Sequence, residues 1–104
     1  MSTPPVIRLL FPFTSASGER IEELAIRRLK RRDLADAQRH SKDEAVIEDH
    51  LLCKMTGLTL EDLETLDLAD SRTVTEVFRE LVAGRDGTAV LGRSAAPGAE
   101  DAAE

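Results

Sequence analysis

The spacing of the apolar residues changes about a quarter of the way along the chain, and this change constrains the fold more than any other feature of the sequence. In the run V-I-R-L-L-F-P-F the apolar residues of one parity are typical of the buried face of a β-strand: Ile7, Leu9, Phe11 and Phe13. Farther along, apolar residues recur every three or four positions, as on the buried face of a helix. The sequence therefore predicts an α+β fold, with strands first and helices after them.

The first 27 residues predict a β-hairpin with a long loop. Pro12 cannot donate a ladder hydrogen bond, so we expect it near a strand end or a sheet edge. Residues 14–18 supply turn-forming side chains, and a second extended run covers Ile21 to Arg27, with Leu24 and Ile26 on one face. Because an isolated hairpin is barely stable in water, helices must cover its apolar side.

Two helices are expected after the hairpin. The first covers about residues 30–39. Ser41 is the expected N-cap of the second, with Glu44 as its capping-box partner, and Gly57 ends it in a left-handed conformation. The apolar positions of the second helix are four residues apart: Ile47, Leu51 and Met55.

Two further helices are expected before Gly84. Thr59 begins a short helix over residues 60–66, and either Asp67 or Asp70 caps the last one. That last helix has the clearest helical stripe in the chain: Val74, Val77, Phe78, Leu81 and Val82.

The expected core is aliphatic, because the chain has three Phe and no Trp or Tyr. Nine residues are predicted to be buried together: Leu24, Ile26, Leu34, Ile47, Leu51, Leu63, Val77, Phe78 and Leu81. A core this small is marginal, so burial of a further face against a partner or a second copy would stabilise it. Three regions are predicted, namely a flexible arm (1–5), one α+β domain (6–84) and a flexible acidic tail rich in Gly and Ala (85–104).

Composition excludes several classes of function. The net charge of −6 argues against a general affinity for nucleic acid. No run of about 18 apolar residues is present, so no membrane span is expected. The N-terminus does not read as a secretory signal, and the single cysteine, Cys53, fits a reducing cytosol.

No catalytic, cofactor or metal site is predicted. His40, His50 and Cys53 are three conceivable zinc ligands, but a structural site needs four, so we interpret them as a buried thiol and surface histidines. Phosphate-binding Gly-rich loops are absent. A series of acidic residues follows the expected helix starts and is better explained by the helix dipole than by acid–base catalysis: Glu61, Asp62, Glu64, Asp67 and Asp70.

The strongest charge feature is the basic run R-R-L-K-R-R (residues 27–32). We interpret it as a solvated strand-to-helix junction, with several of its side chains pairing with Glu19, Glu22, Glu23 or Asp33, while binding of an acidic protein partner stays open. Residues 56–81 also fit a helix-turn-helix outline, but Glu76 and Glu80 accompany Arg72 and Arg79 there, which disfavours DNA reading.

The order of these parts resembles the phage tail assembly chaperones, the family that groups the Mu-like tail chaperone with the E proteins of other contractile-tailed phages. The resemblance covers about residues 6–83, although Ser71 stands where the family pattern has an aromatic. The most specific part is T-G-L-x-x-E-D-L-x-x-L-D-x-x-D: Thr56, Gly57, Leu58, Glu61, Asp62, Leu63, Leu66, Asp67 and Asp70.

The resemblance implies a non-enzymatic factor of virion morphogenesis in the host bacterial cytoplasm, absent from the mature virion. Its implied partner is the tape measure protein, which it holds in solution while the tail tube assembles; the tail tube protein and a second copy of the chain are further candidates. A small DNA-binding regulator or a generic adaptor is the alternative. An apolar groove between helices would suit such a partner, and five residues are candidates to line it: Leu58, Leu60, Val74, Phe78 and Val82.

Overall fold

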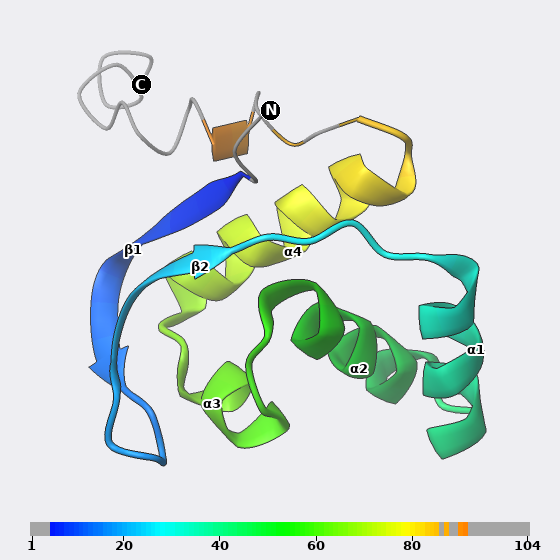
Figure 1. Ribbon diagram of the computed structural model, residues 1–104, viewed down its shortest axis with the longest axis horizontal. Coiled ribbons are helices and arrows are strands. Elements are labelled where there is room, and N and C mark those ends of the chain that lie inside the picture. The colour runs from blue at the N-terminus through cyan, green and yellow to red at the C-terminus, as the bar shows by residue number, and fades with distance from the viewer. Residues whose placement is uncertain (1–4, 86, 88–89, 92–104) are drawn as a thin grey trace.

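A computed structural model describes residues 5–85, 87, 90 and 91 of the chain. An antiparallel hairpin of β1 (Val6–Thr14) and β2 (Arg20–Ala25) comes first. The helices are α1 (Arg31–His40), α2 (Glu44–Thr56), α3 (Leu60–Thr65) and α4 (Leu68–Val82). Helix α4 packs against β1, and α2 packs against the other three helices, so that the hairpin and α1 lie at opposite ends of the molecule (Figure 1). The predicted α+β hairpin and four helices are confirmed.

The hairpin contains a large bulge in β1. Val6, Ile7 and Arg8 pair with Ala25, Leu24 and Glu23, whereas Phe13 and Thr14 pair with Ile21 and Arg20. Residues 9–12 of β1 therefore lie opposite Glu22 alone. Pro12 lies inside this bulge, where its missing N–H costs no ladder hydrogen bond.

The side chain of Asp70 completes the hydrogen bonding of this bulge. The backbone N–H groups of Leu10 and Phe11 donate to its two carboxylate oxygens, at 2.8 and 2.9 Å. Asp70 is 1 % exposed and lies in the first turn of α4, so these bonds attach the hairpin to that helix. Asp62, in the first turn of α3, similarly accepts a 3.0 Å bond from Ala16 N–H in the hairpin loop.

The bulge changes which residues of β1 are buried. Ile7 and Leu9 are buried as predicted, but Phe11 is 55 % exposed and Phe13 is half-buried. The prediction of a single buried face from Ile7 to Phe13 is wrong beyond Leu9, because the extra residues turn the strand before Phe11. The second strand is also shorter than predicted, although Ile26, just after its end, is buried.

Most helix ends follow their predicted caps. Thr59 accepts a bond from Asp62 N–H, and Asp67, of the two candidates considered, caps α4 by accepting from Ala69 N–H. Gly57 follows α2 with a φ of 80°, a conformation that favours glycine. The expected N-cap at Ser41 is wrong. Asp43 caps α2, so Glu44 is its first residue and no capping-box partner, while Ser41 Oγ accepts a bond from the Asp43 N–H.

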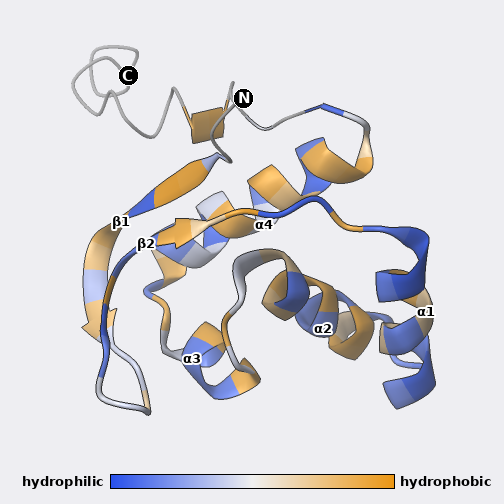
Figure 2. Ribbon diagram, in the orientation of Figure 1, coloured by the Kyte–Doolittle hydropathy of each residue, from blue (hydrophilic) through white to orange (hydrophobic). Residues whose placement is uncertain are grey.

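The core lies between the hairpin, α2, α3 and α4, whereas α1 is hydrophilic along most of its length (Figure 2). The cluster of buried residues that forms this core is entirely aliphatic apart from one methionine: Ile7, Leu9, Leu24, Ile26, Leu52, Met55, Leu63, Leu66, Val74, Val77, Leu81 and Val90. Three residues predicted to be core, Leu34, Ile47 and Phe78, are only half-buried, and Leu51 is buried outside this cluster. Of these four residues, Phe78 still packs against the cluster.

The folded domain continues past the predicted boundary at Gly84. Val90 is 5 % exposed and belongs to the core cluster, and Leu91 packs against it. Gly87 lies so close to Val77 that a Cβ there would approach the valine Cγ1 to 3.2 Å. The rest of the predicted tail, residues 92–104, and the predicted arm, residues 1–4, lie outside the described residues.

Replacing Val90 with Ala should therefore destabilise the fold. Two buried methyl groups are lost, so we expect the free energy of unfolding to fall by about 1–3 kcal/mol in a urea titration. The same substitution at Val82, which is 67 % exposed, is the control and should change stability by less than about 0.5 kcal/mol. Equal effects at the two positions would contradict the placement of Val90 in the core.

Asp70→Asn should be destabilising for a different reason. The asparagine amide offers one acceptor oxygen where the carboxylate offers two, so one N–H of the bulge loses its partner and the amide NH2 is left buried in its place, at a cost of about 1–3 kcal/mol. Asp67→Asn removes the same charge from the same helix turn but keeps an N-capping side chain, so it should cost under about 0.5 kcal/mol. Thermal and urea unfolding of both variants measure how much stability each substitution removes. An Asp67→Asn variant as unstable as Asp70→Asn would contradict the special role of Asp70.

Candidate partner-binding groove

The segment between β2 and α1, residues 26–30, is held between the ends of two helices. The backbone N–H of Arg27 donates to the carbonyl of Met55 near the end of α2, at 3.0 Å. The guanidinium of Arg28 donates to the carbonyls of Leu81 and Arg85, at 2.8 and 2.9 Å. Arg28 thus satisfies a carbonyl at the C-terminal end of α4, where a cation also interacts favourably with the helix dipole.

Arg27 makes the second anchor of this segment. Its two terminal nitrogens donate to the two carboxylate oxygens of Asp33 at 3.1 and 3.2 Å, and the Lys30 N–H donates to the same carboxylate at 2.8 Å. These hydrogen bonds, first that of Arg27, lower the pKa of Asp33 from 3.8 to about 2. Of the pairings predicted for the basic run, that of Arg27 with Asp33 is confirmed, and it fixes the start of α1 relative to β2. Glu22 pairs instead with Arg20, at 3.9 Å.

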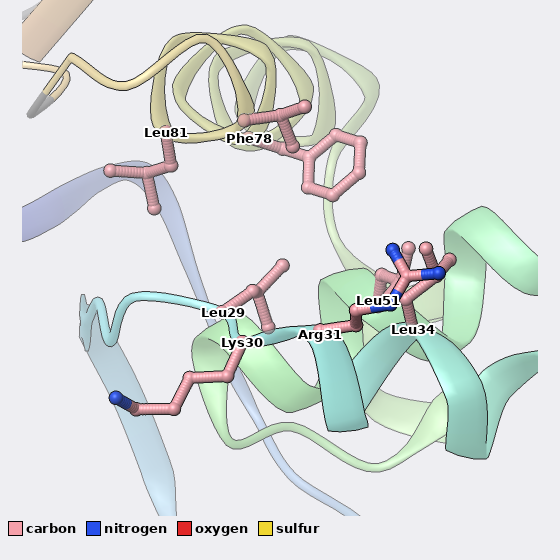
Figure 3. Close-up of a pocket in the computed structure, with 8 residues that line it drawn as sticks. Leu29, Lys30, Arg31, Leu34, Leu51, Phe78 and Leu81 are labelled. Carbon is pink, nitrogen blue, oxygen red and sulfur yellow. The ribbon is translucent and has the colours of Figure 1, made fainter.

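An apolar groove of about 320 Å³ opens between this segment, α1, α2 and α4. Phe78 and Leu81 of α4 point toward Leu29 across the groove, and Leu34 and Leu51 lie on the α1–α2 side (Figure 3). Val82, which is 67 % exposed, also lines it. This volume is at the lower end of the range of ligand pockets, about 300–1,000 Å³, so the groove has room for a few apolar side chains.

Two cationic residues, Lys30 and Arg31, also line the groove. The Arg31 side chain points toward Leu34 and Leu51, whereas the Lys30 side chain points away from these two leucines (Figure 3). Within the part of the chain that the structure describes, neither side chain forms an ion pair. The groove thus combines apolar walls with positive charge.

A second depression, of about 300 Å³, lies between α2, α3 and α4 and has the opposite charge. Its lining includes Glu48, Asp49 and Glu64, and Leu68 projects at its edge with 83 % of its surface exposed. The two depressions therefore offer different chemistry to a partner.

The five residues predicted to bind a partner do not form one surface. Phe78 and Val82 line the basic groove, and Leu60 is 43 % exposed on α3. Leu58 is half-buried and packs against the core, and Val74 is completely buried. Val74 therefore has no exposed surface to offer a partner, unlike the candidate lining residue that it was predicted to be.

Sequence reasoning missed the other walls of the groove, which are Leu29, Leu34, Leu51 and Leu81, and the cations at its edge. The available signal was Leu29, a single large apolar residue inside a run of five cations. Such a residue has no reason to lie in a purely solvated junction.

The side chains of His40, His50 and Cys53, the conceivable zinc ligands, are not arranged as a metal site. The two imidazole rings stack with their centroids 4.6 Å apart. Burial, and then the carboxylates of Asp49 and Glu64, raise the pKa of the Cys53 thiol, which makes it a poorer nucleophile. Among the described residues no group of three His, Cys, Asp or Glu side chains is placed to hold a metal ion.

Two further observations concern membranes and DNA. Within residues 5–85, 87, 90 and 91, no helix combines the length and the apolar character needed to cross a bilayer. On α4, which the helix-turn-helix alternative would place in a DNA groove, Arg72 pairs with Glu76 at 4.0 Å. A carboxylate next to a phosphate-contacting arginine would repel DNA.

A small α+β domain with an apolar groove is typical of proteins that bind other proteins. The family model described as "Phage tail assembly chaperone proteins, E, or 41 or 14" matches residues 6–83. The match spans the hairpin and all four helices, and the chain belongs to this family. No curated protein and no solved structure matches it.

The Arg27–Asp33 pair predicts an acid-sensitive contribution to stability. Because the pKa of Asp33 is about 2 in the folded protein against an ordinary 3.8, the unfolded chain takes up this proton first as the pH falls. The contribution is complete above about pH 5 and is lost as the pH falls through 3.8 toward 2. Asp33→Asn should thus be less stable than the parent at pH 7, and the difference should shrink by pH 2. Urea unfolding of both proteins between pH 2 and pH 7 measures this difference in the free energy of unfolding. A difference that does not change with pH would contradict the Arg27–Asp33 pairing.

Proposed function

We propose that this chaperone binds the tape measure protein and holds it in solution while the tail tube assembles around it. The observation that carries the proposal is the apolar groove of Figure 3, on a protein that belongs to the tail assembly chaperones. A tape measure protein is a long helical chain with apolar stripes, and such stripes aggregate unless another apolar surface covers them until the tube does.

The proposed activity is one of binding alone, without catalysis. It needs an apolar surface that is available before assembly and released after it. The groove offers exposed or half-buried apolar side chains, those of Leu29, Leu34, Phe78 and Val82, above the buried Leu51 and Leu81. Binding of this kind would take place in the host bacterial cytoplasm, and the chaperone would be absent from the mature virion. The tail tube protein is a second candidate partner within the same function.

Co-expression with the tape measure protein of the same phage tests the proposal. The tape measure protein should move from the pellet to the supernatant and co-purify with this chain. Because apolar burial dominates the binding, the complex should persist at about 0.5 M salt, where charges more than about 4–5 Å apart are screened. An unrelated long helical protein is the control for general solubilisation. Equal precipitation of the tape measure protein with and without this chain would contradict the proposal.

A further inference from the structure

We propose that the groove recognises an amphipathic helix that carries acidic residues beside its apolar stripe, with the apolar side chains between Leu29 and Phe78 and a carboxylate paired with Arg31. This inference rests on the proposed function, since the helix would belong to the tape measure protein. It adds the chemistry of the recognised segment, which membership of the family does not specify.

The walls of the groove favour an apolar occupant. Leu29, Phe78 and Val82 are half-buried or exposed, although each is large and apolar, and they face one depression rather than lying scattered on the surface. Helix α4 presents Phe78 and Val82 on one face, since they are four residues apart. An apolar helix stripe with residues at i, i+3 or i+4 and i+7 has a matching spacing.

The position of the cations favours a negatively charged occupant. The chain has a net charge of −6, yet five of its 14 Lys and Arg residues lie within residues 27–32. The fold uses Arg27 to hold Asp33 and Arg28 to hold the end of α4. Lys30 and Arg31 have no such use among the described residues, and they lie at the groove.

The local structure does not require these charges either. Lys30 and Arg31 lie at the N-terminal end of α1, where the helix dipole disfavours cations. A carboxylate from a partner would meet both the guanidinium of Arg31 and the positive end of the helix. Charge complementarity therefore favours an acidic partner, while an acidic helix would be repelled by the second depression with Glu48, Asp49 and Glu64.

Overlapping peptides of about 25 residues from the tape measure protein of the same phage, labelled with a fluorophore, are the probe. They are titrated with the full chain, and fluorescence anisotropy measures binding. The peptides that bind should place Asp or Glu beside an apolar stripe. Arg31→Glu and Val82→Asn should each weaken this binding at least about tenfold, because one removes the ion pair and the other an apolar contact.

Two matched variants serve as controls. Arg32→Glu makes the same change of charge one residue along α1, on an exposed side chain outside the groove, and Leu68→Asn removes an apolar side chain exposed at the other end of α4. Each should change the dissociation constant less than about twofold. A peptide whose acidic residues are replaced by Lys should bind the parent poorly and the Arg31→Glu variant better.

Several results would overturn the inference. If Arg31→Glu and Arg32→Glu weakened binding equally, or Leu68→Asn weakened it more than Val82→Asn, the partner would bind elsewhere. If the groove variants lost self-association in sedimentation while still binding the peptides as the parent does, a second copy would be the occupant. If the variants retained the full-length tape measure protein normally, the groove proposal alone would fail. If the parent chain bound neither peptides nor the full-length protein, the proposed function itself would fail.

Discussion

A buried carboxylate in the first turn of α4 connects the two halves of this fold. Asp70, which is itself buried, accepts the N–H groups of Leu10 and Phe11 in the β1 bulge, where neither residue has a pairing partner in β2. Asp62 and Asp33 occupy the same third position of α3 and α1 and also hold backbone N–H groups, those of Ala16 and Lys30. Three helix starts thus bind neighbouring backbone through aspartate side chains, which compensates for a small aliphatic core.

The parts of the fold that depend on neighbouring residues could be predicted from the sequence, and those that depend on distant ones could not. The caps at Gly57, Thr59 and Asp67 follow from local hydrogen bonding and backbone preference. The bulge depends on a carboxylate 60 residues away, so alternation along β1 could not reveal that Phe11 is exposed. Val90 was missed because a single buried residue after a helix carries no periodic signal. Ser41 and Asp43 both suit an N-cap, so local preference alone could not separate them.

The residues that carry the family resemblance and those that line the groove are largely different. In the motif of residues 56–70, the glycine, threonine and aspartates end helices, cap them or hold the hairpin. The groove is built from residues 29–34 and 78–82 together with Leu51, which meet only in the folded chain. The motif therefore identifies the scaffold without locating the surface that meets a partner. Arg28 helps to assemble the groove, because its bonds to the end of α4 hold Leu29 opposite Phe78.

The distribution of charge also affects which partners can approach. At about 0.15 M ionic strength the screening length is about 8 Å, so the charges of either depression interact only weakly with a partner far from the surface. Near contact, the partner interacts mainly with the charges closest to it. A uniformly acidic segment would meet the carboxylates of this chain, whose net charge is −6, as soon as it extended beyond the groove. A helix with acidic residues only beside its apolar stripe would meet Arg31 without that repulsion. Charge placement would therefore select the register of the bound helix, while apolar burial in the groove would supply most of the affinity.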